Sequence, residues 1–167
     1  MSRGSHRFAS LISLAGALLC WTAPASAQAP ADDRVQLLAV VDTALAAISR
    51  KDFVALTDLM LDSAVVFSAG VRDGQVRVSF RTRAQERATT SEGTWTERGF
   101  DPQVMISGPL ATVWLPYDFY LDGAWSHCGV DVFILLKVEA GWRIATIAYS
   151  VEQPPACQQH PDGRPAK

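Results

Sequence analysis

The stretch from Tyr117 to Tyr149 constrains the fold of this chain more than any other, because it predicts two successive β-hairpins. Asp122-Gly123 lies between two runs rich in apolar residues, and Asp-Gly suits the positive φ angles that a type I′ turn requires. A second turn near Ala140-Gly141 leads into a third strand that ends around Tyr149. The chain therefore contains antiparallel strands, and the register of the first turn decides which side chains meet.

Helices are predicted before the strand region. In the first, apolar residues recur at steps of three and four, as expected for one buried face, and Asp32 or Asp33 is a suitable N-cap. These apolar residues are Leu38, Val41, Leu45 and Ile48. Asp52 is a suitable cap for a shorter second helix, whose expected buried side consists of Phe53, Leu56 and Met60.

Strands are predicted over most of the remaining chain. The expected strands are 64–68, 75–80, 94–98, 103–107, 111–121, 124–138 and 142–152, with a short helix within 81–91. Helices followed by strands in hairpin order predict an α+β protein with a predominantly antiparallel sheet.

The beginning of the chain has the pattern of a secretory signal peptide. Basic residues precede an apolar run over 8–21, and Ala25-Ser26-Ala27 supplies a small-residue cleavage site. A membrane anchor would need about 20 uninterrupted apolar residues. We therefore expect a signal peptide over 1–27, a disordered N-terminus over 28–32, one domain over 33–153 and a tail over 154–167. The expected location is periplasmic or secreted, with no membrane contact after the signal is removed.

Two cysteines remain after residue 27, Cys128 and Cys157. An even number of cysteines in an oxidising compartment predicts a disulfide. The second hairpin returns the chain beside the start of the 124–138 strand, so a bridge would tether the tail to the sheet and contribute about 3 kcal/mol. The alternative is two unrelated thiols.

Charge and motifs exclude several function classes. Removing Arg3 and Arg7 from the 15 Lys and Arg leaves 13 against 17 Asp and Glu, a net charge of −4. This balance argues against nucleic acid as a partner. The sequence has no Gly-rich phosphate loop, no Gly-x-Ser-x-Gly elbow and no close His/Cys spacing for zinc, so we expect no cofactor and no metal.

Two amphipathic helices, a short strand and a terminal meander with Gly141-Trp142-Arg143-Ile144 resemble the nuclear transport factor 2-like superfamily. This superfamily includes ketosteroid isomerase, scytalone dehydratase and the SnoaL-like polyketide cyclases. The similarity covers roughly residues 33–152. The resemblance implies a cone-shaped α+β barrel, in which N-terminal helices pack in a strongly curved, mainly antiparallel sheet. It also implies a pocket at the open end of the cone, with Asp, His or Tyr on its inner face, and a homodimer.

A two-residue turn at Asp122-Gly123 predicts a candidate site. In an unbroken ladder Tyr120 faces Trp125 and Asp118 faces His127, with Cβ atoms about 5 Å apart. Asp118 would then orient the imidazole of His127, leaving its other nitrogen free to move a proton. The alternative is a cross-strand polar pair beside an exposed turn.

The same strand face is expected to carry Asp131, about 13 Å along the strand from His127. An aromatic pocket would desolvate Asp131 and raise its pKa, as a general base near neutrality requires. The candidate catalytic residues are His127, Asp118 and Asp131. The candidate ligand-binding residues are Trp114, Trp125, Phe133 and Tyr149, although such tryptophans are also common in cores.

Two features stay open in the sequence. A two-residue loop at Ala140-Gly141 puts Ser150 beside Asp131, whereas a three-residue loop puts Tyr149 there. Arg81, Arg83 and Arg87 form either a site for an anionic ligand or a solvated basic surface.

The sequence thus predicts an exported domain that binds a small, largely apolar molecule in a cone-shaped pocket. The first alternative is a proton-transfer enzyme, an isomerase, dehydratase or cyclase, that uses His127 with Asp118 or Asp131. The second is a dimerising interaction module without a ligand.

Overall fold

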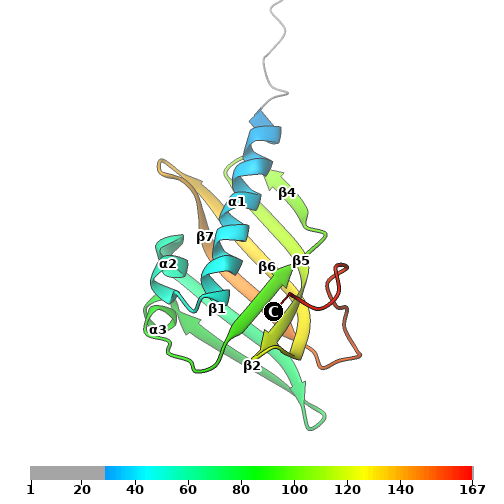
Figure 1. The fold of residues 1–167 in the computed structure, drawn as a ribbon. Helices are drawn as coiled ribbons and strands as arrows, with labels where there is room; N and C mark the ends of the chain where they lie inside the picture. The colour runs from blue at the N-terminus through cyan, green and yellow to red at the C-terminus, as the bar shows by residue number, and fades with distance from the viewer. Residues whose placement is uncertain (1–28, 167) are drawn as a thin grey trace, which may run out of the picture.

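The computed structural model describes residues 29–166, and the predicted signal peptide lies outside them. A long N-terminal helix, α1 (Ala29–Ser49), crosses one face of a curved seven-stranded sheet (Figure 1). We call the sheet face toward α1 the inner face and the opposite face the outer face. Residues 29–32, which we expected to be disordered, form the beginning of α1. No helix in the described range is long and apolar enough to cross a membrane.

The remaining elements follow the predicted order. They are α2 (Phe53–Asp58), β1 (Met60–Arg72), β2 (Gln75–Thr82), α3 (Arg83–Arg87), β3 (Trp95–Gly99), β4 (Gln103–Ser107), β5 (Leu110–Leu121), β6 (Ala124–Val138) and β7 (Gly141–Val151). The strands lie in the order β2-β1-β7-β6-β5-β3, and β4 also pairs with β5. Only β1 and β7 pair in parallel among these strands. The predicted α+β class and curved, mainly antiparallel sheet are confirmed.

Two β-bulges change the register that the turns alone would set. Beside the first turn, Leu121 pairs with Ala124 and Tyr120 with Trp125, as predicted. Ser126 then has no partner on β5, so His127 pairs with Phe119 and Cys128 with Asp118. A bulged residue shifts all later pairs by one, which turns their side chains to the other face relative to β5.

The second bulge lies between β6 and β7. Leu135 pairs with Ile144, but Ile134 pairs with Thr146, so Ala145 is the extra residue. As a result Tyr149 pairs with Asp131. The turn is a two-residue loop, but it lies at Glu139-Ala140, since Val138 pairs with Gly141. Tyr149, one of the two residues considered, does lie beside Asp131, although the bulge and not a three-residue loop sets this pair.

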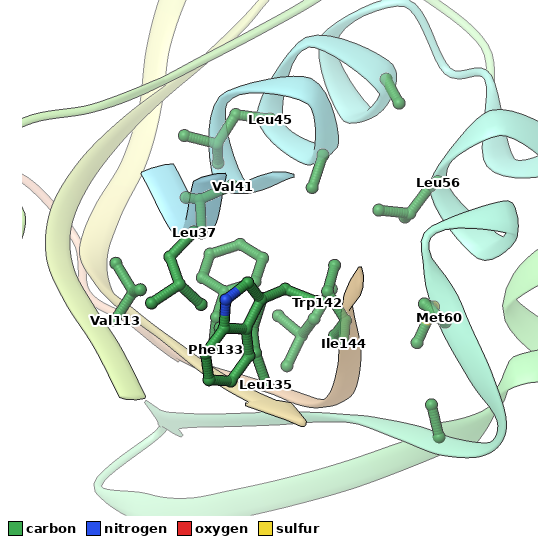
Figure 2. Close-up of a cluster of buried hydrophobic side chains, with 14 of the residues drawn as sticks. Leu37, Val41, Leu45, Leu56, Met60, Val113, Phe133, Leu135, Trp142 and Ile144 are labelled. Atoms are coloured by element: carbon green, nitrogen blue, oxygen red, sulfur yellow. The ribbon is translucent and has the colours of Figure 1, made fainter. Parts of the chain in front are cut away.

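The core lies between α1 and the inner face. Leu37, Val41 and Leu45 of α1 point toward the sheet (Figure 2). They pack on residues of β5, β6 and β7 that are at most 4 % exposed, namely Val113, Phe133, Leu135, Trp142 and Ile144. Asp33 accepts hydrogen bonds from Lys137 Nζ (2.6 Å) and Trp142 Nε1 (3.1 Å), which anchors the start of α1.

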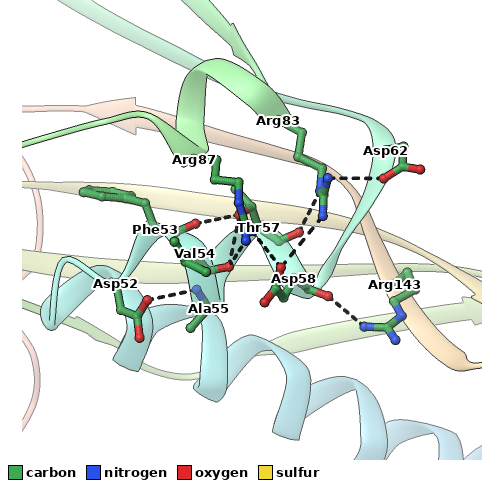
Figure 3. Close-up of polar contacts among 10 residues, drawn as sticks. All are labelled: Asp52, Phe53, Val54, Ala55, Thr57, Asp58, Asp62, Arg83, Arg87 and Arg143. Atoms are coloured by element: carbon green, nitrogen blue, oxygen red, sulfur yellow. Dashed lines mark hydrogen bonds and ion pairs between the residues drawn. The ribbon is translucent and has the colours of Figure 1, made fainter.

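Polar contacts join α2 and α3 at the edge of this core (Figure 3). Asp52 is the predicted cap of α2, and its carboxylate accepts a hydrogen bond from Ala55 N at 2.9 Å. Arg87 pairs with Asp58 at 2.7 Å, and Arg83 Nε donates a hydrogen bond to Thr57 O at 2.8 Å. Arg83 and Arg87 therefore hold the two short helices together.

The tail covers part of the outer face instead of extending freely. Cys157 forms the predicted disulfide with Cys128, their Cα atoms 5.8 Å apart. Beyond it, His160 N donates a hydrogen bond to Asp118 Oδ2 at 3.0 Å, and Arg98 Nη2 donates one to Gly163 O at 2.6 Å. In Figure 1 this segment (red) folds back beside β5. The tail is therefore held to the sheet by hydrogen bonds as well as by the predicted disulfide.

Candidate active site

A cavity of about 480 Å³ opens between the helices and the inner face of the sheet. Its apolar walls combine the aromatic residues Phe53, Trp95, Tyr117, Phe119 and Tyr149 with the aliphatic residues Ile48, Leu56, Val66, Leu121 and Ile147. The ring of Trp95 contacts Phe53 and Phe119 edge-on, with centroid distances of 5.9 and 5.3 Å. A cavity of this size with apolar walls and a few polar groups is typical of a small-molecule site.

Two carboxyl groups lie together in this cavity. Glu97 comes from β3 and Asp131 from β6, and their side chains share a hydrogen bond, so at least one of them carries a proton. Burial, followed by the neighbouring Asp131, raises the pKa of Glu97 well above its usual range. Burial raises the pKa of Asp131 to about 7, and the hydrogen bond with Glu97 only partly offsets this. Two carboxyls that share one proton are suited to taking up or releasing a proton near neutral pH.

Asp131 also has an unused acceptor. The residue is 3 % exposed, and apart from the hydrogen bond with Glu97 its carboxyl group has no donor for Oδ2 within residues 29–166. Tyr117 stands nearby, but its hydroxyl donates to Ser150 O at 2.7 Å. A buried carboxylate oxygen without a donor is unfavourable unless a ligand or water supplies one.

His127 lies in the wall of the same cavity. Its ring stacks on Phe119 with a centroid distance of 4.6 Å, and its Nδ1 lies 3.1 Å from Ser126 Oγ. Burial lowers the pKa of His127, so its imidazole is neutral at neutral pH. His127 therefore contributes a polar but uncharged edge.

Arg81 reaches the cavity from β2 and forms an ion pair with the buried Glu86 of α3. It also hydrogen-bonds the phenol of Tyr149. Burial opposes its charge, but the contacts with Glu86 and Tyr149 outweigh burial and raise the pKa of Arg81. Its positive charge is thus balanced within the protein.

The segment 88–94, which we call the mouth loop, borders the opening of the cavity. Thr89, Ser91 and the exposed Glu92 line the cavity from this loop. Lys51 Nζ donates hydrogen bonds to the carbonyl oxygens of Ser91 and Gly93. At its end, Thr94 N donates to Asp122 Oδ1 at 2.7 Å, so the loop is fastened at two points.

The structure separates the residues that the sequence grouped together. His127, Asp131 and Tyr149 line the cavity, whereas Asp118 lies on the outer face. Asp118 is fully buried beneath the tail and pairs with Arg98 through both carboxylate oxygens, at 3.0 and 2.6 Å. The predicted contact between Asp118 and His127 was wrong, because the bulge at Ser126 puts their side chains on opposite faces.

The predicted aromatic ligand residues also lie in different parts of the structure. Trp114 is 36 % exposed on the outer face, and Trp125 pairs with Tyr120 on that face. Phe133 is fully buried in the core beneath α1. None of these three lines the cavity, so the structure does not bring Trp114, Trp125 and Phe133 into the candidate site.

Glu97 was missed by the analysis of the sequence. It lies two residues after Trp95 in a predicted strand, so strand periodicity already puts both on one face. The missing information was the pairing of β3 with β5, which brings Glu97 opposite Phe119 and toward Asp131.

Solved structures with the same fold are numerous, although their sequences differ. An NTF2-like protein with a cystatin-like fold from Novosphingobium aromaticivorans aligns with a TM-score of 0.62 and 15% identity, over 79% of this chain and 90% of that chain. The β subunit of a candidate aromatic-ring-hydroxylating dioxygenase from the same organism aligns with a TM-score of 0.63 and 8% identity, over 83% and 99%. A candidate dehydratase of the NTF2-like family from Streptomyces avermitilis aligns with a TM-score of 0.55 and 20% identity, over 73% and 97%.

No protein-family model matches the sequence, and no curated protein is similar to it. The similarity to these solved structures therefore concerns the fold and not the sequence. The chain has the nuclear transport factor 2-like fold that its sequence pattern predicted.

Proposed function

We propose that this protein binds a small, largely apolar molecule in the cavity between its helices and the inner face of the sheet. The observation that carries this proposal is a buried carboxyl pair, Glu97 and Asp131, inside a cavity of about 480 Å³ with aromatic walls. The walls would bind an apolar body, and the few polar groups would orient it.

Binding is tested with N-phenyl-1-naphthylamine, a neutral dye that fluoresces in apolar surroundings. The wild type should enhance its emission, with saturation at one dye per chain. Thr89→Trp, at the mouth loop, should block entry and weaken binding by about tenfold or more. Thr43→Trp, on the exposed side of α1, is the matched control and should bind as the wild type does. Equal binding by both variants would contradict the proposed location.

The carboxyl pair favours a second function on the same site, proton transfer at a carbon atom of the bound molecule. A base with a pKa of about 7, as for Asp131, is suited to this step at neutral pH. In the proposed step the ligand's C–H bond breaks, an O–H bond forms on Asp131, and the electron pair moves to a carbonyl oxygen of the ligand. Protonated Glu97 would donate a hydrogen bond to that oxygen, and His127 lies in the wall as a further polar group.

This second function is tested by following hydrogen exchange of 2-tetralone in D₂O by NMR. The wild type should accelerate exchange of the protons beside the carbonyl, and Asp131→Asn should reduce the acceleration at least about 100-fold. His127→Ala should leave binding intact and lower turnover if His127 takes part. Binding of 2-tetralone without accelerated exchange would contradict the proton-transfer function and leave the binding function standing. Among proteins of this fold, one is described as a candidate dehydratase, which makes this test worthwhile.

We also propose that the protein is exported. The signal-like sequence over residues 1–27 and the disulfide between Cys128 and Cys157 both support an oxidising compartment. Mass spectrometry of protein from the culture medium or periplasm should find a chain that starts at Gln28. Accumulation of the full-length chain in the cytoplasm would contradict export.

A further inference from the structure

The charges around the cavity are unevenly distributed. Of the described residues that line it, Arg81 is the only Lys or Arg, and its charge is balanced by Glu86. Three further acidic residues line the cavity, Glu92 at the mouth and Glu97 and Asp131 inside. With one proton shared by the inner pair, the cavity keeps a net negative charge.

The unused acceptor lies at the same place. Apart from the hydrogen bond with Glu97, the buried carboxyl group of Asp131 has no donor for Oδ2 within residues 29–166, and the neighbouring hydroxyl of Tyr117 is bound to Ser150 O. A ligand group that donates a hydrogen bond to the carboxyl group of Asp131 would satisfy this acceptor. A group that also carries positive charge would form a charge-assisted bond, which is stronger than a neutral one.

The walls suit a cation as well. The rings of Trp95, Tyr117, Phe119 and Tyr149 all line the cavity. The face of an aromatic ring attracts an ammonium group, and this attraction is strongest where water is excluded.

We infer that the ligand is a small hydrophobic amine, whose ammonium group binds Asp131 and whose apolar body packs against the aromatic walls. This inference rests on the proposed function and specifies its ligand class. A carboxylate ligand would be repelled by Glu92, Glu97 and Asp131, since Arg81 is already paired. A neutral alcohol could supply a donor to Asp131 Oδ2 but not the countercharge.

Three probes of nearly equal shape separate these classes: 4-phenylbutylamine, 4-phenyl-1-butanol and 4-phenylbutyrate. Their affinities are measured by quenching of tryptophan fluorescence and by calorimetry at pH 8. We expect the amine to bind at least about tenfold more tightly than the alcohol, and the carboxylate to bind more weakly than both.

Asp131→Asn should lower the affinity for the amine at least about tenfold, while the affinity for the alcohol changes less than about threefold. Glu97→Gln should also lower the affinity for the amine. This second variant keeps the test valid if Asp131→Asn fails to fold. Asp62→Asn, which removes an almost fully exposed acid outside the cavity, is the matched control and should change neither affinity.

The pH gives an independent readout. Because the pKa of Asp131 is raised to about 7, the amine should bind more weakly at pH 5, where Asp131 is protonated. The other charged and titratable groups that line the cavity are Tyr117, His127, Tyr149, Arg81, Glu86 and Glu92. Of these, His127 also titrates below neutrality, so the same pH profile is measured in Asp131→Asn, where the pH effect on amine binding should largely disappear.

The outcomes are distinct. Equal or tighter binding of the alcohol by the wild type would overturn the amine and leave the proposed binding function standing. Tighter binding of the carboxylate than of the amine would likewise overturn the amine as ligand class without affecting the proposed binding function. Failure of all three probes and of the neutral dye to bind would overturn both proposals.

Discussion

At the scale of single residues, the carboxyl pair has a cost in stability. The folded protein raises the pKa of Asp131 from 3.8 to about 7, whereas the unfolded chain leaves it near its ordinary value. As the pH rises, Asp131 therefore loses its proton in the unfolded chain at a lower pH than in the folded protein. By linkage, the contribution of Asp131 to stability is largest at acidic pH and is lost as the pH rises through this interval.

Asp131→Asn should therefore stabilise the protein at pH 8 by about 2–4 kcal/mol, and by much less at pH 4, because an amide has no charge to desolvate. The free energy of unfolding, measured in urea at both pH values, checks this. His127, whose pKa is lowered, acts in the opposite direction but is common to both proteins, so it does not affect their difference. A variant less stable than the wild type at pH 8 would contradict the assignment of a buried, destabilised charge.

The same residues illustrate what sequence periodicity can and cannot predict. His127 and Asp131 were assigned to one face because they lie four positions apart in one strand, and the structure puts both in the cavity. Asp118 was assigned to that face by counting pairs outward from the turn, and this failed at Ser126. A bulge depends on how the strand bends around the core, so an unbroken count from a turn does not contain it.

At the scale of elements, the tail and the outer face of β5 depend on one another. Asp118 and Arg98 form a buried pair, and the tail supplies His160 N and Gly163 O to the same two side chains. Removing the carboxylate would leave the guanidinium of Arg98 beneath the tail without its countercharge.

Asp118→Ala should therefore destabilise the protein by about 3–5 kcal/mol and release the tail. The free energy of unfolding in urea measures the first effect, and hydrogen exchange of the His160 amide measures the second. Asp62→Ala, whose ion pair with Arg83 is exposed, should change stability by less than about 1 kcal/mol. Slow exchange at His160 in Asp118→Ala would show that the disulfide alone holds the tail.

The order of helices and strands was predictable because each strand is a long apolar or alternating run. Strands 103–107 and 124–138 match β4 and β6 in full. The parallel contact between β1 and β7 was not predicted, because it joins strands from opposite ends of the domain without a local turn signal. The register of a pair such as Val66 and Ile147 is set by the curvature of the finished sheet.

At the scale of the whole molecule, the outer face carries several exposed apolar side chains. Beyond the part covered by the tail, several large side chains are exposed. They include Phe67 (38 %), Val76 (73 %), Val78 (68 %), Phe80 (62 %), Met105 (66 %) and Trp114 (36 %). Exposed apolar surface of this kind is typical of an interface.

We therefore predict that this face joins two copies of the chain. Sedimentation of the wild type should give twice the monomer mass, and Val78→Lys combined with Phe80→Glu should give a folded monomer. Val35→Lys, an exposed apolar residue on α1, is the control and should remain dimeric. A wild type that stays monomeric at high micromolar concentration would contradict the prediction.

The fastening of the mouth loop has a consequence for kinetics. Lys51 and Asp122 hold this loop from two separate turns of the chain, and neither residue lines the cavity. Because the loop borders an opening that already exists, its fastening keeps this opening at a constant width. The rate at which a molecule enters or leaves would then depend on that width, while its equilibrium affinity would depend on the aromatic walls and the carboxyl pair.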